Sequence, residues 1–208
     1  MPEADHRITD EARLEEVLGA PMDFVRQKVL PRLNDAMRQF IRRSPLVFVA
    51  TVDAGGLPDV SPKGDPEGFV EVDGEGRLLI PERPGNRLTF GFRIILRNGE
   101  IGLIFVVPNQ LETLRVKGRA SLRTDPEVLD AMQVGGKPAL LYTRVEVEEC
   151  FFHCGKALVR SKLWQPDAWN ENRRSIAARG LMSPGVLDEE AVRQTEAALE
   201  RAYTDELY

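Results

Sequence analysis

Short runs of β-branched and aromatic residues, separated by turns that contain glycine or proline, fill the segment 44–122 and constrain the fold more than any other feature of this sequence. The run 46–52 comes first, and the turn 53–56 after it holds residues that tolerate a positive φ angle. Further runs of the same kind lie at 57–60, 69–72, 77–80, 101–107 and 112–122. Because most of these runs are joined by short turns, we expect successive antiparallel strands that form a small β-barrel.

A cationic connection at 81–87 is the strongest indication of a ligand. Arg83 and Arg87 bring two guanidinium groups to one rim of the predicted barrel. Arginine forks bind a phosphate monoester bidentately and keep their charge at any working pH. We expect Asn86 to cap a short helix at 87–96, so that the first-turn N–H groups of this helix add to the anion site. The alternative interpretation is a solvated basic turn before a helix.

The composition of the whole chain narrows the classes of function. The 208 residues carry a formal net charge of −5, and the basic residues are dispersed, which argues against a nucleic-acid partner. No apolar stretch is long enough to span a bilayer, and the first residues are polar and acidic, unlike a signal peptide. Two cysteines cannot form a disulfide framework. We therefore expect a cytoplasmic protein without a membrane partner.

Apolar residues at near-helical spacing flank the predicted barrel on both sides. We expect three segments, which are an N-terminal helical segment packing on the barrel (1–43), the barrel itself (44–164) and a C-terminal helical segment (165–208). An acidic first turn at 188–190 favours the start of the last helix. Glycine-rich stretches at 135–138 and 180–185 are the candidate linkers.

Cys150, His153 and Cys154 stand within five residues and invite a zinc interpretation. A structural zinc site uses four ligands, and the only other histidine is His6, so we expect no metal here. A Cys/His nucleophilic pair is also disfavoured, because adjacent residues of a strand face opposite ways. The segment 150–154 is best interpreted as a buried structural strand.

The order of these pieces resembles the FMN-binding split-barrel superfamily typified by pyridoxamine 5'-phosphate oxidase. The resemblance covers roughly 40–169 and extends to a subclass known simply as FMN-dependent enzymes. The matching motifs are Gly56-Leu57-Pro58, Ser61-Pro62-Lys63-Gly64, Leu79-Ile80-Pro81, Arg83-Pro84-Gly85-Asn86-Arg87, the segment 98–105, Arg115-Val116-Lys117-Gly118-Arg119-Ala120 and the segment 150–157.

The resemblance implies a mainly β fold with some α, namely an antiparallel Greek-key split barrel with flanking N- and C-terminal helices. It also implies FMN sites at the interface of a homodimer, with the phosphate near Arg83, Asn86 and Arg87. Main-chain groups of two strands would border the ribityl chain and the ring, and a segment after residue 155 would come from the other protomer. The cofactor-binding residues so implied are Ser61, Pro62, Lys63, Ile80, Pro81, Arg83, Asn86, Arg87, Lys156, Arg160 and Trp164.

Two departures from the family pattern limit this reading. Ser61 stands where the superfamily usually has an arginine, so Lys63 is a less certain phosphate ligand than Arg87. The C-terminal Arg-x-His and Glu-Phe-Trp-x-Gly signature for the pyridoxal-phosphate product is absent. Oxidation of pyridoxamine phosphate itself is therefore disfavoured.

The resulting hypothesis is an FMN-dependent oxidoreductase that transfers hydride or electrons through flavin N5 to a small molecule. NAD(P)H is the candidate electron donor, and no acid or base is identified. Three alternatives stay open, which are a deazaflavin-dependent reductase, a non-catalytic flavin or haem carrier with His153 as the axial ligand, and a protein-interaction barrel without a chromophore.

Overall fold

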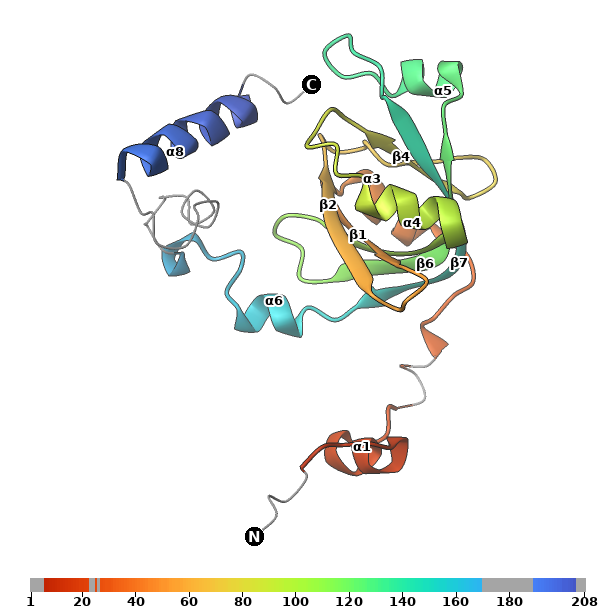
Figure 1. Cartoon of the computed structure of the whole chain (residues 1–208). Helices are drawn as coiled ribbons and strands as arrows, with labels where there is room; N and C mark the ends of the chain where they lie inside the picture. The colour runs from red at the N-terminus through yellow and green to blue at the C-terminus, as the bar shows by residue number, and fades with distance from the viewer. Residues whose placement is uncertain (1–5, 23–24, 26, 170–188, 205–208) are drawn as a thin grey trace.

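A curled antiparallel sheet forms the body of the molecule in the computed structural model, which describes residues 6–22, 25, 27–169 and 189–204 (Figure 1). The strands within this part of the chain are β1 (Leu46–Val52), β2 (Pro58–Gly64), β3 (Glu71–Val72), β4 (Leu78–Glu82), β5 (Glu100–Val106), β6 (Thr113–Arg123) and β7 (Leu141–His153). Their order across the sheet is β2-β1-β5-β6-β7-β4-β3, and all neighbours are antiparallel.

Strands β4 to β7 have Greek-key connectivity. Strands β5, β6 and β7 are consecutive neighbours, and β4 lies beside β7 although the chain passes through helix α4 (Phe90–Asn98) between β4 and β5. The barrel is split because β2 and β4 are not neighbours in the hydrogen-bonded sheet. The expected antiparallel split β-barrel with flanking helices is thereby confirmed.

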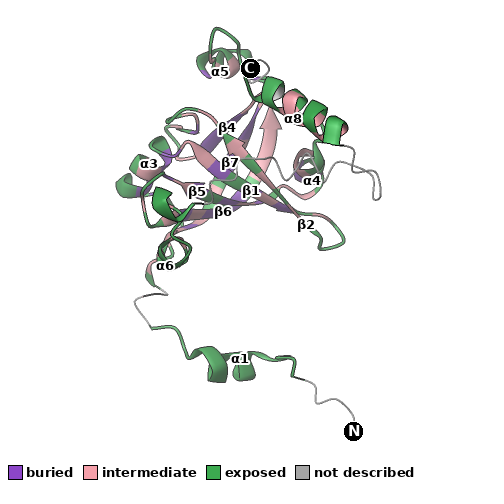
Figure 2. Ribbon diagram, turned by 90° about the vertical axis from the view of Figure 1, so that its left-hand side faces the viewer, coloured by how far each residue is buried: buried purple, intermediate pink, exposed green. Residues whose placement is uncertain are grey.

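The hydrophobic core lies on the inner face of the sheet. Along β1, Val47, Val49 and Thr51 are buried, and the residues that alternate with them are at least partly exposed. Helix α3 (Asp35–Arg42) adds Met37 and Ile41 to the same core (Figure 2). The alternation therefore fixes which side chains of β2, paired to β1, face the interior.

Strand lengths differ from the sequence predictions where long-range pairing decides them. The motif 61–64, which the predicted run 57–60 leaves outside the strand, is the second half of β2, and β2 pairs with β1 along its whole length. Prolines at 58 and 62 are tolerated because β2 is an edge strand, where a missing N–H need not break a ladder. The predicted run 69–72 shortens to the two residues of β3, and β7 begins well before the predicted 150–154.

The helices at the two ends behave differently. Helix α3 packs on the barrel as expected, whereas α1 (Glu11–Leu18) has no buried residue. Figure 1 shows α1 and α8 (Glu189–Thr204) set apart from the sheet. The candidate linker 180–185 lies outside the described residues, and the division into three segments stays a prediction. None of the described helices combines the length and the apolar character that crossing a membrane requires.

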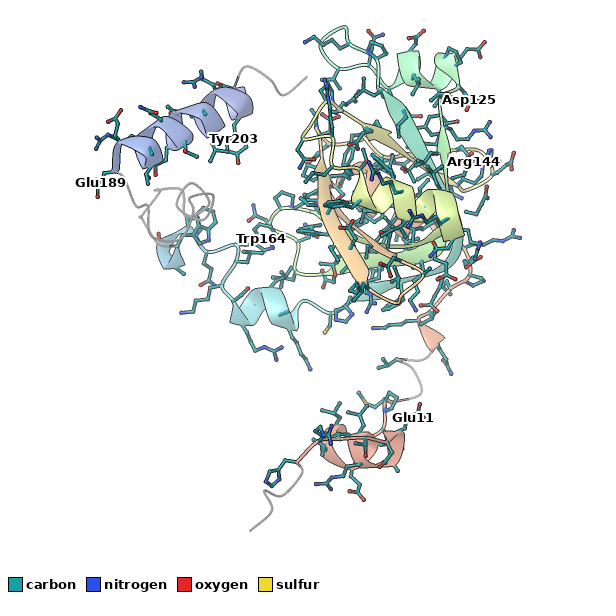
Figure 3. The ribbon with its side chains drawn as sticks, viewed as in Figure 1. Glu11, Asp125, Arg144, Trp164, Glu189 and Tyr203 are labelled. Atoms are coloured by element: carbon teal, nitrogen blue, oxygen red, sulfur yellow. The ribbon has the colours of Figure 1, made fainter. Side chains whose placement is uncertain are left out.

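The glycine-rich stretch 135–138 connects helix α5 (Pro126–Ala131) to β7 within the barrel unit. Asp125, before α5, accepts hydrogen bonds from Tyr142 Oη at 2.7 Å and from Arg123 Nε at 3.0 Å (Figure 3). These hydrogen bonds, from Arg123 first and Tyr142 second, lower the pKa of Asp125 to about 2. The carboxylate thus ties the start of α5 to β6 and β7.

We expect this tie to weaken in acid. The pKa of Asp125 is about 2 in the folded protein against an ordinary value of 3.8, so its stabilisation is present above about pH 4 and is lost as the pH falls towards 2. Urea unfolding between pH 2.5 and 6 should show Asp125→Asn less stable than the wild type near neutrality, with a difference that shrinks in acid. A constant difference across this range would contradict the assignment.

Candidate functional site

A cavity of about 660 Å³ opens between the two strands that bound the split. Strand β2 forms one wall, and β4 together with the loop 83–89 and the first turn of α4 forms the other. Eight of the eleven residues predicted to bind the cofactor line this cavity. They are Ser61, Pro62, Lys63, Ile80, Pro81, Arg83, Asn86 and Arg87.

The alternation of β2 explains which of its side chains reach the cavity. Asp59, Ser61 and Lys63 are half-buried, whereas Pro58 and Pro62 are exposed. Their cross-strand partners on β1 are inner-face residues, so these three polar side chains face the interior. Sequence reasoning missed Asp59, although its place two residues before Ser61 on an alternating strand could have revealed it.

Two ion pairs cross the split between β2 and β4. Lys63 Nζ lies 2.6 Å from Glu82 Oε2, and Arg83 Nε lies 2.7 Å from Asp65 Oδ2. The second pair is well buried, with 2% of the Asp65 side chain and 13% of the Arg83 side chain exposed. The two ion pairs connect β2 to β4 across the split. They also give Lys63 and Arg83, two of the predicted cofactor-binding cations, carboxylate partners within the protein.

One guanidinium nitrogen of Arg83 takes no part in this ion pair. Arg83 Nη1 is buried and has no hydrogen-bond partner within the part of the chain that the structure describes. Arg87 is exposed, and no hydrogen bond or ion pair to it is found among the described residues. A buried N–H without a partner costs free energy, and an anion in the cavity would remove that cost. Arg83 and Arg87 are therefore the groups best placed to receive a phosphate.

The loop between β4 and α4 differs from the prediction. Helix α4 begins at Phe90, not at residue 87, because Arg87 and Thr89 have φ angles of 60° and 55°. Asn86 Oδ1 accepts a hydrogen bond from the Leu88 N–H at 3.0 Å, so Asn86 shapes a turn in the loop and does not cap the helix. Thr89 occupies the N-cap position, but its Oγ1 accepts a hydrogen bond from Arg93 Nε at 3.2 Å and caps no backbone N–H of the helix. Two residues in left-handed conformations that are not glycines mark this loop as strained.

The rest of the lining is mostly apolar. Lys63 Nζ lies 4.7 Å from the centre of the Phe92 ring, a cation–π contact at the cavity wall. Val49, Ile80 and Ile95 line the interior side. The charged lining residues are Asp59, Asp65 and Glu82 against Lys63, Arg83 and Arg87, a formally neutral set. A cavity of this size, in which apolar walls are combined with charged groups, can hold a small ligand that has an anionic end.

Lys156, Arg160 and Trp164 are not brought to the cavity within one chain. Lys156 and Arg160 begin and end helix α6 (Lys156–Arg160), directly after β7. Trp164 Nε1 donates a hydrogen bond to the carbonyl oxygen of Gln110 at 2.9 Å, in the turn between β5 and β6 (Figure 3). A role for these three residues at a cofactor stays a prediction.

The cysteine and histidine segment lies at the end of β7. Cys150 is buried, its Sγ donates to the Leu30 carbonyl oxygen at 3.4 Å, and burial raises the pKa of its thiol. His153 and Cys154 are exposed and do not line the cavity. The predicted buried strand at 150–154 is therefore only partly right, because Cys150 alone is buried and Cys154 lies beyond the end of β7. Cys150 anchors the residues before α3.

Fold and cavity together define a class, an antiparallel split barrel with an arginine-lined cavity between β2 and β4. The family model for pyridoxamine 5'-phosphate oxidase matches residues 33–154 of the chain. Because this match spans more than half of the 208 residues, the chain belongs to the pyridoxamine 5'-phosphate oxidase family.

Similar solved structures include HupZ of Group A Streptococcus, General Stress Protein 26 of Bacillus anthracis and HutZ, the heme storage protein of Vibrio cholerae. They are 24%, 11% and 18% identical to this chain, with TM-scores of 0.46, 0.44 and 0.37. The alignments cover 58%, 55% and 58% of this chain and 93%, 88% and 94% of the other chains. A comparison with curated proteins gave no match. Family membership rests on the family model.

Proposed function

We propose that the protein is an FMN-dependent oxidoreductase that acts on a small molecule. The observation that carries this proposal is the buried Arg83 Nη1, which has no hydrogen-bond partner among the described residues, in a cavity that the exposed Arg87 also lines. Family membership adds support, since the family model is that of pyridoxamine 5'-phosphate oxidase, an oxidase named for a phosphorylated substrate. The same arginines serve both FMN and a deazaflavin, so the chromophore has to be identified directly.

FMN, when bound, supplies hydride or single-electron transfer at its N5 atom. In this proposal Arg83 and Arg87 bind the phosphate, and main-chain groups of β2 and β4 border the rest of the cofactor. Lys63 is held by Glu82 and Phe92, so its charge has a fixed place in the wall. Ile80 and Ile95 supply apolar surface on the interior side of the cavity.

The proposed enzyme is a homodimer with its sites at the interface. Support comes from the outer face of the sheet, where Phe48, Val60 and Ile104 are exposed on the adjacent strands β1, β2 and β5. Contiguous exposed apolar side chains of this kind often mark protein interfaces. Helix α6 and Trp164 follow β7 away from their own cavity, and we propose that they reach the site of the partner. Sedimentation equilibrium tests the dimer.

We further propose NAD(P)H as electron donor and the cytoplasm as the location. The two cysteines of the chain are free thiols, and one of them is exposed, which fits a reducing compartment. Donor choice is tested by the rate at which NADH or NADPH bleaches the bound flavin without oxygen.

The visible spectrum of the purified protein, followed by mass identification of the released chromophore, tests the proposal. Flavin bands and the mass of FMN are the expected result. A Soret band would support a haem protein, and a deazaflavin mass would support the reductase alternative. A colourless protein that also binds no added FMN would overturn the proposed function.

Arg87→Ala should weaken FMN binding by about ten- to hundred-fold, because a charge-assisted contact to the phosphate is lost. Riboflavin, which has no phosphate, should bind both proteins nearly equally. Quenching of flavin fluorescence measures both affinities. Arg97→Ala removes an arginine at the far end of α4, outside the cavity, and should change neither. Equal losses for FMN and riboflavin in Arg87→Ala would mean that Arg87 acts through the fold.

A further inference from the structure

Helix α1 carries a stripe of carboxylates and exposed leucines along one side. Glu11, Leu14, Glu15 and Leu18 are spaced i, i+3, i+4 and i+7, so they share one face of the helix. Both leucines are exposed. Neither Glu11 nor Glu15 forms a side-chain hydrogen bond or an ion pair with any residue that the structure describes. We call these four residues the acidic stripe, and nothing in the described part of its own chain covers it.

A cluster of opposite charge lies on the outer face of the sheet. Arg115 of β6 and Phe151 of β7 are cross-strand partners, and they face away from the core because Val116 and Cys150, which follow or precede them, are buried in it. The Cζ atom of Arg115 and the Nζ atom of Lys28 each lie 5.3 Å from the centre of the Phe151 ring. Within the described residues, no carboxylate pairs with either cation. We call Lys28, Arg115 and Phe151 the cationic cluster.

The cationic cluster continues the apolar patch of the proposed dimer interface. Phe48 of β1 lies opposite Ile104 of β5, and Ile104 lies opposite Arg115 of β6. Phe151 completes this row across four neighbouring strands. Side chains at directly paired positions are neighbours on one face of a sheet. A second copy that covers Phe48 and Ile104 therefore comes next to the cluster.

Helix α1 does not cover the cationic cluster of its own chain. Figures 1 and 2 both show α1 set apart from the sheet, and every residue of α1 is exposed. The backbone N–H and carbonyl groups of Leu30 both bond to Cys150, which fixes the chain to the edge of β7. The ten residues from Leu18 to Lys28 span at most about 36 Å. This length lets α1 extend from its own sheet to a molecule packed against that sheet.

We propose that α1 of one chain docks on the cationic cluster of a second copy, and that the two copies exchange these helices reciprocally. The two carboxylates of the acidic stripe pair with Lys28 and Arg115, and its two leucines cover the Phe151 ring. Charge and apolar surface are complementary, since each side supplies what the other lacks. The inference rests on the proposed function, because it names the segment that completes the proposed homodimer.

Charge reversal on either side tests the exchange. In Glu11→Lys/Glu15→Lys and in Lys28→Glu/Arg115→Glu, like charges face each other at both contacts of the homodimer. Sedimentation equilibrium should show the dimer Kd of each variant raised at least about ten-fold. In a heterodimer of the two variants, both contacts are again between opposite charges. Native mass spectrometry of the mixture, with one variant made heavier by isotope labelling, should find heterodimers in more than about four-fifths of the dimers, against about half for random pairing.

Two further variants separate docking from general effects. Glu127→Lys/Asp130→Lys, at exposed positions of α5, changes the net charge by the same amount away from both surfaces and should leave the dimer Kd unchanged. Leu14→Ser/Leu18→Ser should raise the dimer Kd about ten-fold, because apolar contact with the ring is lost. Helix α1 has no buried residue, so this variant should keep the wild-type circular dichroism of the barrel.

Three results would overturn the exchange. Random pairing in the mixture of reversed variants would mean that the acidic stripe does not meet the cluster of another copy. A dimer Kd within two-fold of the wild type in every variant would also overturn it and leave the proposed homodimer standing. A wild type that is monomeric would overturn the proposed homodimer together with the exchange, whereas FMN binding to the wild type is decided separately by the visible spectrum.

Discussion

Asp65→Asn should lower the free energy of unfolding by about 3 kcal/mol, because it leaves the guanidinium of Arg83 without its charged partner in a buried place. The side chains of Asp65 and Arg83 are 2% and 13% exposed, so water replaces the lost carboxylate poorly. The pair also connects the end of β2 to the end of β4, across the split that no backbone ladder closes. Urea unfolding measures the loss.

A double-mutant cycle separates the ion pair from the other contacts of Asp65. Arg83→Met removes the guanidinium but keeps a long apolar stem, and the double variant removes both charges. We expect the double variant to be less destabilised than the sum of the two single variants, because the double variant has no charge that is buried without its partner. Asp130→Asn, on the exposed surface, should change stability by less than about 0.5 kcal/mol. Strict additivity would show that the two side chains do not stabilise the split as a pair.

Gly118→Ala should lower the free energy of unfolding by about 3 kcal/mol, because a Cβ atom at this position would overlap the carbonyl oxygen of Glu146. Gly118 stands in β6 at the point where the register with β7 shifts, so the two backbones approach closely there. The obstructing atom belongs to the backbone of a paired strand, which cannot rotate away as a side chain can. Thermal and urea unfolding both report the loss.

Gly102→Ala is the matched control for Gly118→Ala. Gly102 lies in β5, beside β6, and a Cβ atom there would meet only the Ala50 Cβ at 3.8 Å, an ordinary contact. We expect a neutral change or a gain of up to about 1 kcal/mol, because alanine restricts the unfolded chain. Equal losses of unfolding free energy in the two variants would mean that alanine destabilises these strands for a reason other than the close approach at Glu146.

The sequence predicted most residues of the cavity wall but not the ion pairs that these residues form. Arg83, Asn86 and Arg87 were found because a proline- and glycine-containing loop after a strand places such residues at a rim. Glu82 and Asp65, which pair with the cations of the same wall, were not singled out, because a surface carboxylate and a buried partner look alike in a sequence. The start of α4 was also misplaced, since a positive φ at Arg87 is a property of the folded loop.

The sequence by itself determined the antiparallel strands and the basic loop, because alternation, turns and charge are local properties of the chain. The order of its motifs indicated the split-barrel family through their resemblance to that family. Only the tertiary structure decided that β2 faces β4, that Lys63 and Arg83 are paired across the split, and that Asp59 lines the same cavity. The reason is physical. A strand's pattern fixes which side chains share a face, but the partners opposite that face come from segments distant in sequence, and they are set when the sheet curls.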